Sequence, residues 1–346
     1  MGKILITGAD GFIGSHLTDF YLNRNENVVA LKKPHLSVFN LLHYTDEKDY
    51  FPPKDLQDFE GFKIQIPTNN DKLDIFECDL NDKYLTTNII QQLQPNYIFH
   101  FGAQPNVLES WKDPNYTIKT NVLGTINIFE ALKDSSHSCK VIVACSSAEY
   151  GITTMNLNRA LKESDPLKAI HPYGISKVAA ELIAFQYFLN FNIDSIVLRF
   201  FNQTGPRKIN DACSDFIRKI AQIEAGLTKP VIEVGNLDSY RDILGIKNSL
   251  QAIDLVKEKG KVGDTYNICS NRKIYIRNVL ETALELSTKK IEVIENVPKK
   301  LRKTDEDVIL GDNTKIKDLG FKVTQSIEEL LKEMFDYWLE IYKKQK

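Results

Sequence analysis

Short, nearly uninterrupted apolar segments recur along the first part of the chain and predict six buried β-strands. These segments are rich in valine, isoleucine, leucine and phenylalanine, and they lie at residues 3–8, 27–31, 73–79, 97–102, 141–146 and 195–200. A strand that is apolar on both faces is typical of a parallel sheet with helices on either side, because a solvated face would bring in alternating polar positions.

Stretches with a helical spacing of apolar positions alternate with these strands. The clearest are residues 15–25, 117–134 and 176–191. Alternation of strand and helix predicts right-handed crossovers between parallel strands. We therefore expect an α/β fold of the Rossmann type, in which a doubly wound parallel sheet is followed by a smaller C-terminal α/β domain.

After about residue 200 the regular alternation gives way to loops, shorter strands and shorter helices. We expect a first domain over residues 1–200, with a return segment near 230–260, and a second domain over 201–346. Within the second domain, residues 273–286 are typical of a strand that leads into a helix. Residues 326–344 have the apolar spacing of an amphipathic helix.

Residues 32–72 interrupt the alternation and carry several prolines among clustered aspartates and lysines. A connection of this length without structure of its own is uncommon inside a compact domain. We therefore expect this segment to form a functional flap or local helices.

The composition narrows the class of protein. The chain has 346 residues, of which 42% are hydrophobic and 26% charged, with a formal net charge of -2. This excludes a global basic field for nucleic acid or an anionic membrane, and no apolar segment approaches the roughly 18–20 residues that span a bilayer. The five cysteines are scattered without a C-x-x-C pair, so we expect no metal site and a reducing, cytoplasmic location.

A glycine motif follows the first predicted strand and opens a helix. Gly8, Gly11 and Gly14 form G-x-x-G-x-x-G, with Phe12 and Ile13 between the last two glycines. Glycines at these positions permit a tight turn and let backbone N–H groups approach a pyrophosphate at the helix N-terminus. We expect these five residues to contact a dinucleotide cofactor.

The end of the second predicted strand bears on the choice of cofactor. An NAD site usually has an acidic residue there, which binds the ribose 2′-hydroxyl. This chain has Lys32 and Lys33 instead. Lys32 can pair with a 2′-phosphate, which favours NADP, but a solvated lysine pair that leaves NAD in place stays an alternative. Asp79, with Leu80, ends the third strand and is either a contact to the adenine or an ordinary turn residue.

Tyr173 and Lys177 form Y-x-x-x-K at the start of a helix, which places both side chains on one helix face. A tyrosine with its usual pKa of about 10 is a poor base at neutral pH. A neighbouring ammonium group and the positive charge of a nicotinamide favour its phenolate. Ser146 and Ser147 follow the fifth strand, where a hydroxyl can hydrogen bond to the same substrate oxygen as Tyr173.

Seven motifs occur in the order expected of the extended short-chain dehydrogenases/reductases. They are TGADGFIG, HFGAQ, TNVLGT, SSAEYG, HPYGISK, RFFNQTGP and VGNLDSYRD. The chain resembles most the GDP-mannose 4,6-dehydratases and the GDP-4-keto-6-deoxy-mannose reductases of this epimerase/dehydratase family. The resemblance spans essentially the whole chain and implies chemistry at C4 of a GDP-linked or other nucleotide-linked sugar, with NADP or NAD as cofactor.

The resemblance also implies roles for individual residues. Tyr173 is then the acid/base, Lys177 its partner and Ser146 the assisting hydroxyl, and both Tyr173 and Lys177 also contact the cofactor. The second domain binds the nucleotide sugar, and the implied substrate contacts are Ser147, Asn202, Arg241 and Arg302. A homodimer or homotetramer is expected, paired through helices near 116–133 and 173–190.

The two kinds of enzyme that the chain resembles differ in the turn that follows the fifth predicted strand. The dehydratases have a glutamate in S-T-[D/S]-E-x-Y-G that removes the C5 proton, whereas this chain has Ala148 at that position and Glu149 one residue later. Alanine has no group that transfers a proton. We therefore favour reduction of a GDP-4-keto-6-deoxy sugar.

Three other reactions stay open at the same site. They are 4,6-dehydration with Glu149 recruited as the catalytic group, C4 oxidation and 4-epimerisation. A non-catalytic dinucleotide-binding protein is a more remote alternative, because such proteins usually lack the tyrosine or the lysine. The segment RDILGIKN also departs from the reductase pattern, in which an acidic residue and a final Arg-Asp follow.

Overall fold

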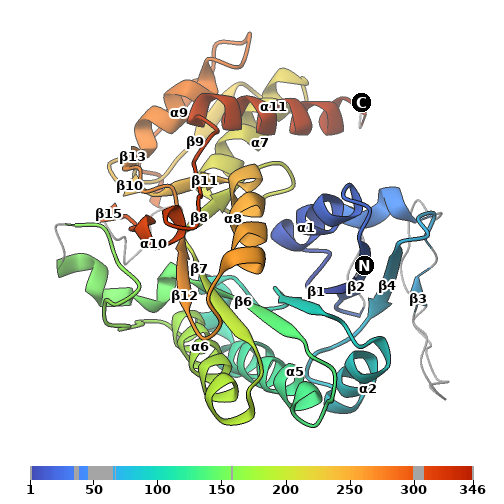
Figure 1. Cartoon of the computed structure of the whole chain (residues 1–346). Coiled ribbons are helices and arrows are strands. Elements are labelled where there is room, and N and C mark those ends of the chain that lie inside the picture. Colours follow the sequence, from blue (N-terminus) through green and yellow to red (C-terminus); the bar gives the residue numbers. More distant parts are fainter. Residues whose placement is uncertain are drawn as a thin grey trace. The chain divides into compact units, whose positions relative to one another are not determined.

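The chain forms two compact units, each of which is described by itself (Figure 1). A computed structural model describes residues 2–34, 39–45, 65–66, 68–156, 159–298 and 308–344. The first unit consists of Met1–Gly151, Pro166–Arg199 and Asp254–Tyr266. The second consists of Ile152–Asp165, Phe200–Ile253 and Asn267–Lys346.

An eight-stranded sheet, in the order β12-β7-β6-β5-β1-β2-β4-β3, forms the centre of the first unit. Its strands are β1 (Lys3–Thr7), β2 (Asn27–Lys32), β3 (Gln65–Ile66), β4 (Leu73–Glu77), β5 (Tyr97–His100), β6 (Lys140–Ser146), β7 (Ser195–Phe200) and β12 (Thr265–Ile268). β1 pairs in parallel with β2 and β5, β2 with β4, and β5 with β6. The expected Rossmann-type sheet and its six predicted strands are therefore confirmed, whereas antiparallel β3 and the edge strand β12 were not predicted.

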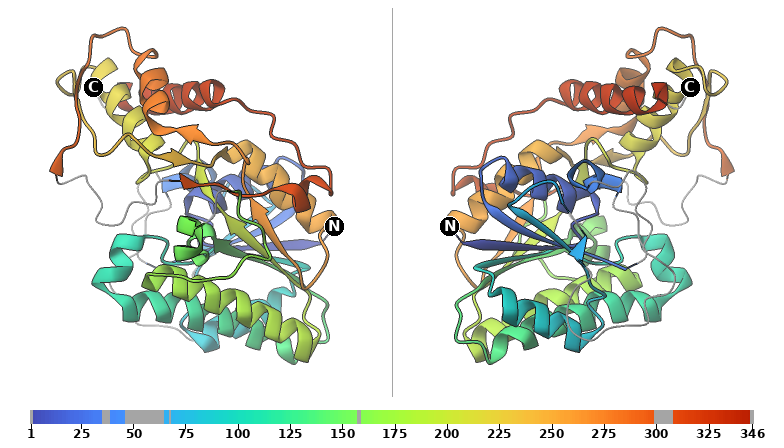
Figure 2. Two further views of the ribbon diagram at one scale, coloured as in Figure 1. Left: turned by 90° about the vertical axis from the view of Figure 1, so that its left-hand side faces the viewer. Right: turned by 90° about the vertical axis from the view of Figure 1, so that its right-hand side faces the viewer.

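Helices cover both faces of this sheet (Figures 1 and 2). α1 (Phe12–Leu22) lies on one face, and α2 (Lys83–Leu93), α5 (Gly124–Lys133) and α6 (Pro172–Phe191) lie on the other. The core between the sheet and these three helices includes Leu5, Ile98, Phe129 and Val141, all with no exposed surface. Each such side chain contributes about 1.5–3 kcal/mol through burial. Among the helices in the described ranges, none is long and apolar enough to cross a membrane.

The helix that carries the Y-x-x-x-K motif begins at a well-defined cap. His171 has an extended backbone, and its Nδ1 accepts a hydrogen bond from the Gly174 N–H at 2.9 Å. Pro172 occupies the first helical position, where its missing N–H costs nothing. This cap fixes the first turn of α6, so the position of Tyr173 follows directly from local sequence.

The predicted helix at 117–134 is interrupted. α3 (Val107–Lys112) and α4 (Pro114–Ile118) precede a π-helical turn at Lys119–Leu123, which continues into α5. A π-turn inserts one residue into the helical repeat and often marks a functional site.

The long segment at 32–72 is described only in part. A 3₁₀ helix covers Phe39–Tyr44, Thr45 forms an antiparallel bridge with Thr68, and β3 follows within this segment. The Asn40 side chain donates a hydrogen bond to the Asp10 carbonyl at 2.8 Å, which ties the 3₁₀ helix to the glycine loop. The rest of the expected flap, residues 35–38, 46–64 and 67, lies outside the described residues.

In its described residues, the second unit contains small sheets and several helices. Its strands are β8 (Asn202–Thr204), β9 (Val231–Glu233), β10 (Tyr240–Arg241), β11 (Ile243–Gly245), β13 (Ile274–Tyr275), β14 (Glu292–Ile294) and β15 (Val308–Ile309). Its helices include α7 (Ala212–Glu224), α9 (Ile276–Leu284), α10 (Thr314–Lys317) and α11 (Ile327–Lys343), while α8 (Ile246–Lys259) begins in this unit. Ile217, Leu331 and Met334 are fully buried where α7 packs against α11. The strand–helix at 273–286 and the terminal amphipathic helix are present as predicted.

Candidate active site

The predicted cofactor loop lies where β1 ends and α1 begins. Gly8 has a φ of 66°, and its carbonyl accepts the Gly11 N–H at 3.0 Å, which closes a tight turn. Gly11 is the N-cap of α1, and no side chain caps this helix. An uncapped helix start directs N–H groups and the positive end of the helix dipole toward an anion.

The glycines of this loop are required by close backbone contacts. A Cβ on Gly14 would lie 2.2 Å from the Gly8 carbonyl oxygen, and one on Gly8 would lie 2.9 Å from the Gly102 backbone. Both neighbours are backbone atoms that cannot rotate away. The loop therefore keeps a cradle free of side chains, which fits the pyrophosphate of a dinucleotide.

Lys32 does not lie as the sequence indicated. Its side chain is fully buried, and its Nζ is 2.5 Å from Glu77 Oε1 and 3.0 Å from the Lys33 carbonyl. The ammonium group is thus neutralised inside the sheet by the last residue of β4. Lys32 is bound to an internal carboxylate where we expected it to meet a 2′-phosphate.

The other two residues expected at the adenosine end have local structural roles. Asp79 Oδ1 accepts hydrogen bonds from the backbone and side chain of Asn81, at 3.0 and 2.9 Å, which forms the turn before α2. Leu80 is 8% exposed, and its side chain lies against the positions where Gly102 and Gly124 lack a Cβ. Both remain at the edge of the sheet where the parallel strands end.

A histidine at the end of β5 stabilises the same edge of the sheet. His100 is buried, with Nδ1 2.9 Å from Thr7 Oγ1 and Nε2 2.9 Å from Thr125 Oγ1. Burial, with a smaller effect of the Lys177 charge, lowers the pKa of His100 to about 3. The ring is therefore neutral at physiological pH and links the ends of β1 and β5 to α5.

Ser146, Tyr173 and Lys177 come together at the end of β6 and the start of α6. Ser146 lies close enough to Tyr173 for its hydroxyl to oppose the rise in the pKa of the phenol. Lys177, one helical turn after Tyr173, is buried and donates from Nζ to the Ala144 carbonyl at 2.7 Å. The expected constellation of hydroxyl, phenol and ammonium is thus assembled within one unit.

The environment of Tyr173 determines which of its forms is present. Burial raises the pKa of Tyr173 to about 12, the hydrogen bond with Ser146 opposes this shift, and Cys145 and Glu149 add to it. Burial also lowers the pKa of Lys177. At neutral pH Tyr173 is therefore a phenol, the form that donates a proton.

Glu149 does not face this constellation. It is 0% exposed, and its Oε1 accepts the Ser146 backbone N–H at 3.1 Å. Its Oε2 lies 3.4 Å from Arg199 Nε. The structure therefore places in the interior the one glutamate that the sequence offered as a recruited catalytic group.

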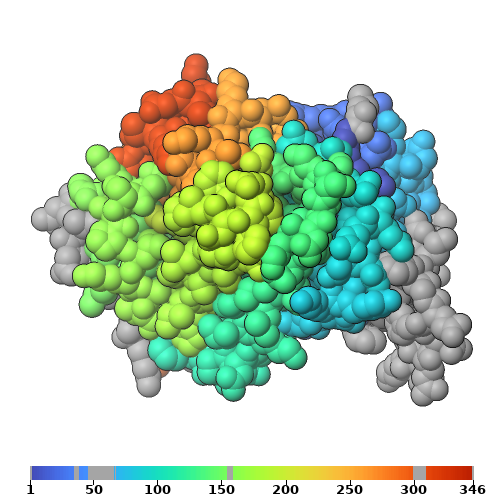
Figure 3. Space-filling view, turned by 60° about the horizontal axis from the view of Figure 1, so that its bottom comes forward, coloured from blue at the N-terminus to red at the C-terminus, as the bar shows by residue number. Residues whose placement is uncertain are grey.

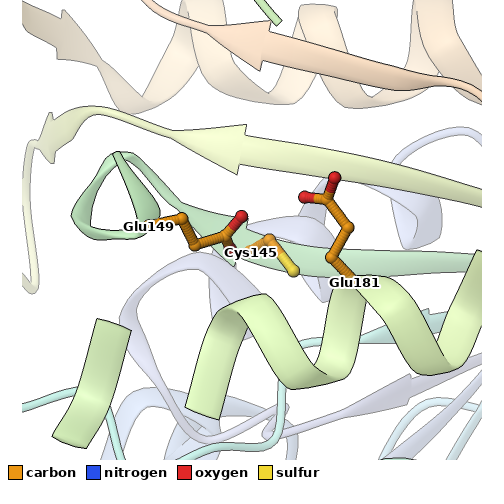
Figure 4. A group of neighbouring side chains, drawn as sticks. All are labelled: Cys145, Glu149 and Glu181. Carbon is orange, nitrogen blue, oxygen red and sulfur yellow. The ribbon is translucent and has the colours of Figure 1, made fainter. Parts of the chain in front are cut away.

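Glu149 also belongs to a cluster that superficially resembles a metal site. Cys145 from β6, Glu149 from the following turn and Glu181 from α6 point into one space, with ligand atoms within 4.8 Å of one another (Figure 4). Arg199 already occupies this space, because its NH2 lies 2.5 Å from Glu181 Oε1. Burial raises the pKa of Cys145 well above its usual value, so the thiol stays protonated. A cation site is therefore disfavoured here.

The predicted substrate residues are distributed over both units. Ser147 lies beside Ser146 in the turn after β6, and its carbonyl accepts the Tyr150 N–H. Asn202 is exposed on β8 and donates to the Asp242 carbonyl at 3.1 Å, while Arg241 on β10 donates to the Tyr240 carbonyl at 2.8 Å. Arg302 lies outside the described residues.

Sequence reasoning missed Asn121, which supports the start of α6. Its side chain is buried in the π-helical turn, accepts the Gln104 N–H at 2.7 Å and donates to Ser176 Oγ at 2.9 Å. Ser176 adjoins Lys177 in the chain. The motif TNVLGT was visible in the sequence, but neither composition nor helical spacing reveals a π-turn.

Fold and site together define a dinucleotide-binding enzyme of the extended short-chain dehydrogenase/reductase type. Residues 5–334 match the family described as GDP-mannose 4,6 dehydratase, and the chain belongs to this family.

Two curated relatives represent the two activities considered above. The chain is 25% identical to the GDP-6-deoxy-D-mannose reductase of Pseudomonas aeruginosa over 338 residues, which cover 97% of each chain. It is also 25% identical to the GDP-mannose 4,6-dehydratase of Yersinia enterocolitica, with coverage of 96% and 93%. Identity at this level does not separate the two reactions.

Solved structures share the fold over nearly the whole chain. RMD from Pseudomonas aeruginosa, complexed with NADPH, has a TM-score of 0.77 at 24% identity, covering 99% of this chain and 100% of that one. The UDP-glucose 4-epimerase of Thermotoga maritima, with UDP-glucose, has a TM-score of 0.79 at 23% identity, with coverage of 98% and 99%. The similarity thus extends across enzymes with different sugar chemistry.

Proposed function

We propose that this protein reduces the C4 ketone of a GDP-4-keto-6-deoxy sugar, with NADP or NAD as the redox cofactor. The observation that carries this proposal is the turn after β6. Ala148 stands where the sequence comparison places the base of the dehydratases, and the neighbouring Glu149 is buried and bound to Ser146 and Arg199. Ser146, Tyr173 and Lys177 are assembled, so the groups for ketone reduction are present.

The chain's own residues provide the proton and the orientation. When bound, the reduced nicotinamide supplies the hydride to C4. Tyr173, held as a phenol by burial, donates its proton to the C4 oxygen as that oxygen gains negative charge. Ser146 orients the same oxygen and stabilises the phenolate that remains, and the Lys177 ammonium does so electrostatically.

In the absence of the oxidised cofactor, Tyr173 is in the form that reduction requires. Oxidation of a C4 hydroxyl needs Tyr173 as a phenolate from the start, which a pKa of about 12 opposes at neutral pH. Reduction needs the phenol, which is the form already present. Dehydration needs a further acid/base at C5, and the turn residue at that position is Ala148.

We assign the remaining contacts to cofactor and nucleotide sugar from the types of residue. Gly8, Gly11 and Gly14, with Phe12 and Ile13, hold the cofactor pyrophosphate. Asp79 and Leu80 border the adenosine. Ser147, Asn202, Arg241 and Arg302 contact the nucleotide sugar, because arginine's planar fork suits diphosphate oxygens.

Consumption of reduced cofactor tests the proposal directly. With purified protein, GDP-4-keto-6-deoxy-mannose and either NADPH or NADH, we expect a stoichiometric fall in NAD(P)H absorbance and a product with a C4 hydroxyl. A flat trace with both cofactors rejects this reaction. Formation of a 4-keto-6-deoxy sugar from GDP-mannose with oxidised cofactor would instead establish the dehydratase.

The protein is a homodimer in this proposal, paired through α6 and its neighbours. α6 exposes Ile175, Leu182, Phe185 and Leu189, which are 51%, 58%, 46% and 58% accessible and recur at helical spacing. α5 packs beside α6, and Figure 3 views this face, with α6 in yellow-green. A second copy that covers this apolar stripe removes it from water.

A charge in the stripe tests the dimer. Leu182→Glu with Leu189→Glu should shift the protein from twice the mass of one chain to the mass of a single chain, because two buried carboxylates would be left unpaired across the interface. Light scattering after size-exclusion chromatography measures the mass. Leu227→Glu, at a 40% exposed leucine of the second unit, is the matched control and should leave the dimer intact. A wild-type protein of single-chain mass would contradict the proposal.

A further inference from the structure

The turn after β6 is closed by a reciprocal pair of hydrogen bonds that includes a buried carboxyl group. Glu149 Oε1 accepts the Ser146 backbone N–H at 3.1 Å, and Ser146 Oγ accepts the Ala148 N–H at 3.2 Å. Together they form a capping box around the 3₁₀ turn Ser147–Glu149. The backbone of Ser146 is therefore held by the side chain of Glu149.

The capping box also determines where the Ser146 hydroxyl points. A hydroxyl has one donor and two acceptor positions. The Ala148 N–H occupies one acceptor position, which leaves the O–H available to Tyr173, and the Ser146 side chain is near enough to lower the pKa of Tyr173. If the turn opened, Ser146 would lose the backbone position that brings its hydroxyl to Tyr173.

Glu149 is itself fixed from its other side. Arg199 lies with its Nε 3.4 Å from Glu149 Oε2 and makes two hydrogen bonds to Glu181, at 2.9 Å from Nε and 2.5 Å from NH2. Arg199 NH1 also donates to the Tyr150 hydroxyl at 2.9 Å. Figure 4 shows Glu149 and Glu181 approaching the same space from the turn and from α6. The turn is thereby tied to the helix that carries Tyr173 and Lys177.

The pKa shifts of Glu149 and Glu181 indicate that this pair of carboxyl groups carries one proton. Burial, together with the nearby charge of Glu181, raises the pKa of Glu149 well above its usual value. Burial also acts on Glu181, but the hydrogen bonds and the positive charge of Arg199, with smaller contributions from Glu149 and Thr265, together outweigh it, and the pKa of Glu181 is lowered. A carboxyl oxygen of Glu149 and one of Glu181 lie within 4.8 Å of each other. Glu149 is then a neutral acid, and the single negative charge on Glu181 is balanced by Arg199.

We infer that Glu149 is a positioning residue: its carboxyl group holds the Ser146 backbone so that the Ser146 hydroxyl faces Tyr173. The inference rests on the proposed function, because Ser146 and Tyr173 are the groups that act on the C4 oxygen there. It gives Glu149 a role distinct from that of a base at C5, and the two roles differ in what a glutamine would do.

Glutamine is the decisive substitution because it copies a neutral carboxylic acid. In Glu149→Gln the amide oxygen still accepts the Ser146 N–H, and the amide NH₂ has the Glu181 carboxylate nearby as an acceptor. We expect its kcat to stay within about threefold of wild type, since near-isosteric hydrogen bonds keep the reacting groups in place. A catalytic base could not survive this change.

Alanine removes both contacts and should release Ser146. We expect kcat of Glu149→Ala to fall about 100-fold, the cost of a small misplacement of a reacting group, while KM and the dissociation constant of NADPH, measured by fluorescence, stay within a few fold. Glu26→Ala, in the turn before β2, is the control for the same substitution elsewhere in this unit. If Glu149→Ala fails to fold, Glu149→Met keeps the volume without the hydrogen bonds and is read in the same way.

Two results would overturn the inference. One is a Glu149→Gln protein that folds and binds NADPH but loses activity as severely as Ser146→Ala, because the charge would then matter. The other is wild-type kcat in Glu149→Ala. Crystal structures of both variants test the inference without substrate: the Ser146 hydroxyl should lie beside Tyr173 in the glutamine variant and be displaced from it in the alanine variant. A wild-type enzyme that reduces no 4-keto sugar would reject the proposed function, whereas these structures would still decide the role of Glu149.

Discussion

Tyr173→Phe should lower kcat for ketone reduction by about a thousandfold, the scale of a lost general acid, while NADPH binds as before. Phenylalanine keeps the ring and its burial at the start of α6 but has no proton to give. The ring contact with His171, at a centroid distance of 6.0 Å, does not involve the hydroxyl and is kept. Steady-state NAD(P)H absorbance measures kcat, and cofactor fluorescence measures binding.

The pH dependence of the wild-type reduction rate provides a second test of the role of Tyr173. Because the acid form of Tyr173 is required and its pKa is raised to about 12, reduction should be insensitive to this group through neutral pH and fall only at strongly alkaline pH. The oxidised cofactor carries a positive nicotinamide, which lowers the pKa of Tyr173, so oxidation of the alcohol product should instead accelerate as pH rises. A Tyr173→Phe enzyme with more than a tenth of the wild-type rate would show that another group supplies the proton.

The sequence allowed prediction of the features that depend on local pattern. Six strands of the sheet, the glycine loop and the pairing of Tyr173 with Lys177 on α6 all follow from apolar periodicity or from fixed spacing along one helix. The cap formed by His171 and Pro172 was not predicted, although its cause lies within four residues. Family resemblance then supplied the reaction, which no periodicity contains.

What could not be predicted depends on residues that are distant in the chain. The direction of the Glu149 carboxylate is set by Arg199 and Glu181, from two other elements, so its position near Ser146 in the sequence was misleading. Asn121 acts from a π-turn, which spacing rules do not produce. The pairing of Lys32 with Glu77 joins two strands 45 positions apart in the chain, and neither residue alone indicates that it is buried.

Lys32→Met should destabilise the protein by about 3–5 kcal/mol, because it leaves the Glu77 carboxylate buried without its partner. Both side chains have no exposed surface, and among the described residues Glu77 Oε2 has no hydrogen-bond partner. The double variant Lys32→Met/Glu77→Met removes both charges and should return to within about 1–2 kcal/mol of wild type or exceed it. Urea unfolding of the cofactor-free protein measures these differences. A single variant as stable as wild type would show that Glu77 is protonated or hydrated.

The same double variant decides whether Lys32 selects the cofactor. Because Lys32 is neutralised by Glu77, we expect the ratio of the NADPH and NADH dissociation constants to stay unchanged when both charges are removed. Lys33→Met is the matched control at the end of β2: its Nζ contacts the exposed Tyr116 hydroxyl at 2.6 Å, and loss of such a surface contact should cost no more than about 1 kcal/mol. A selective loss of NADPH affinity in the double variant would mean that Lys32 leaves Glu77 to bind the 2′-phosphate. If only Lys33→Met loses NADPH affinity, Lys33 is the residue that binds the 2′-phosphate.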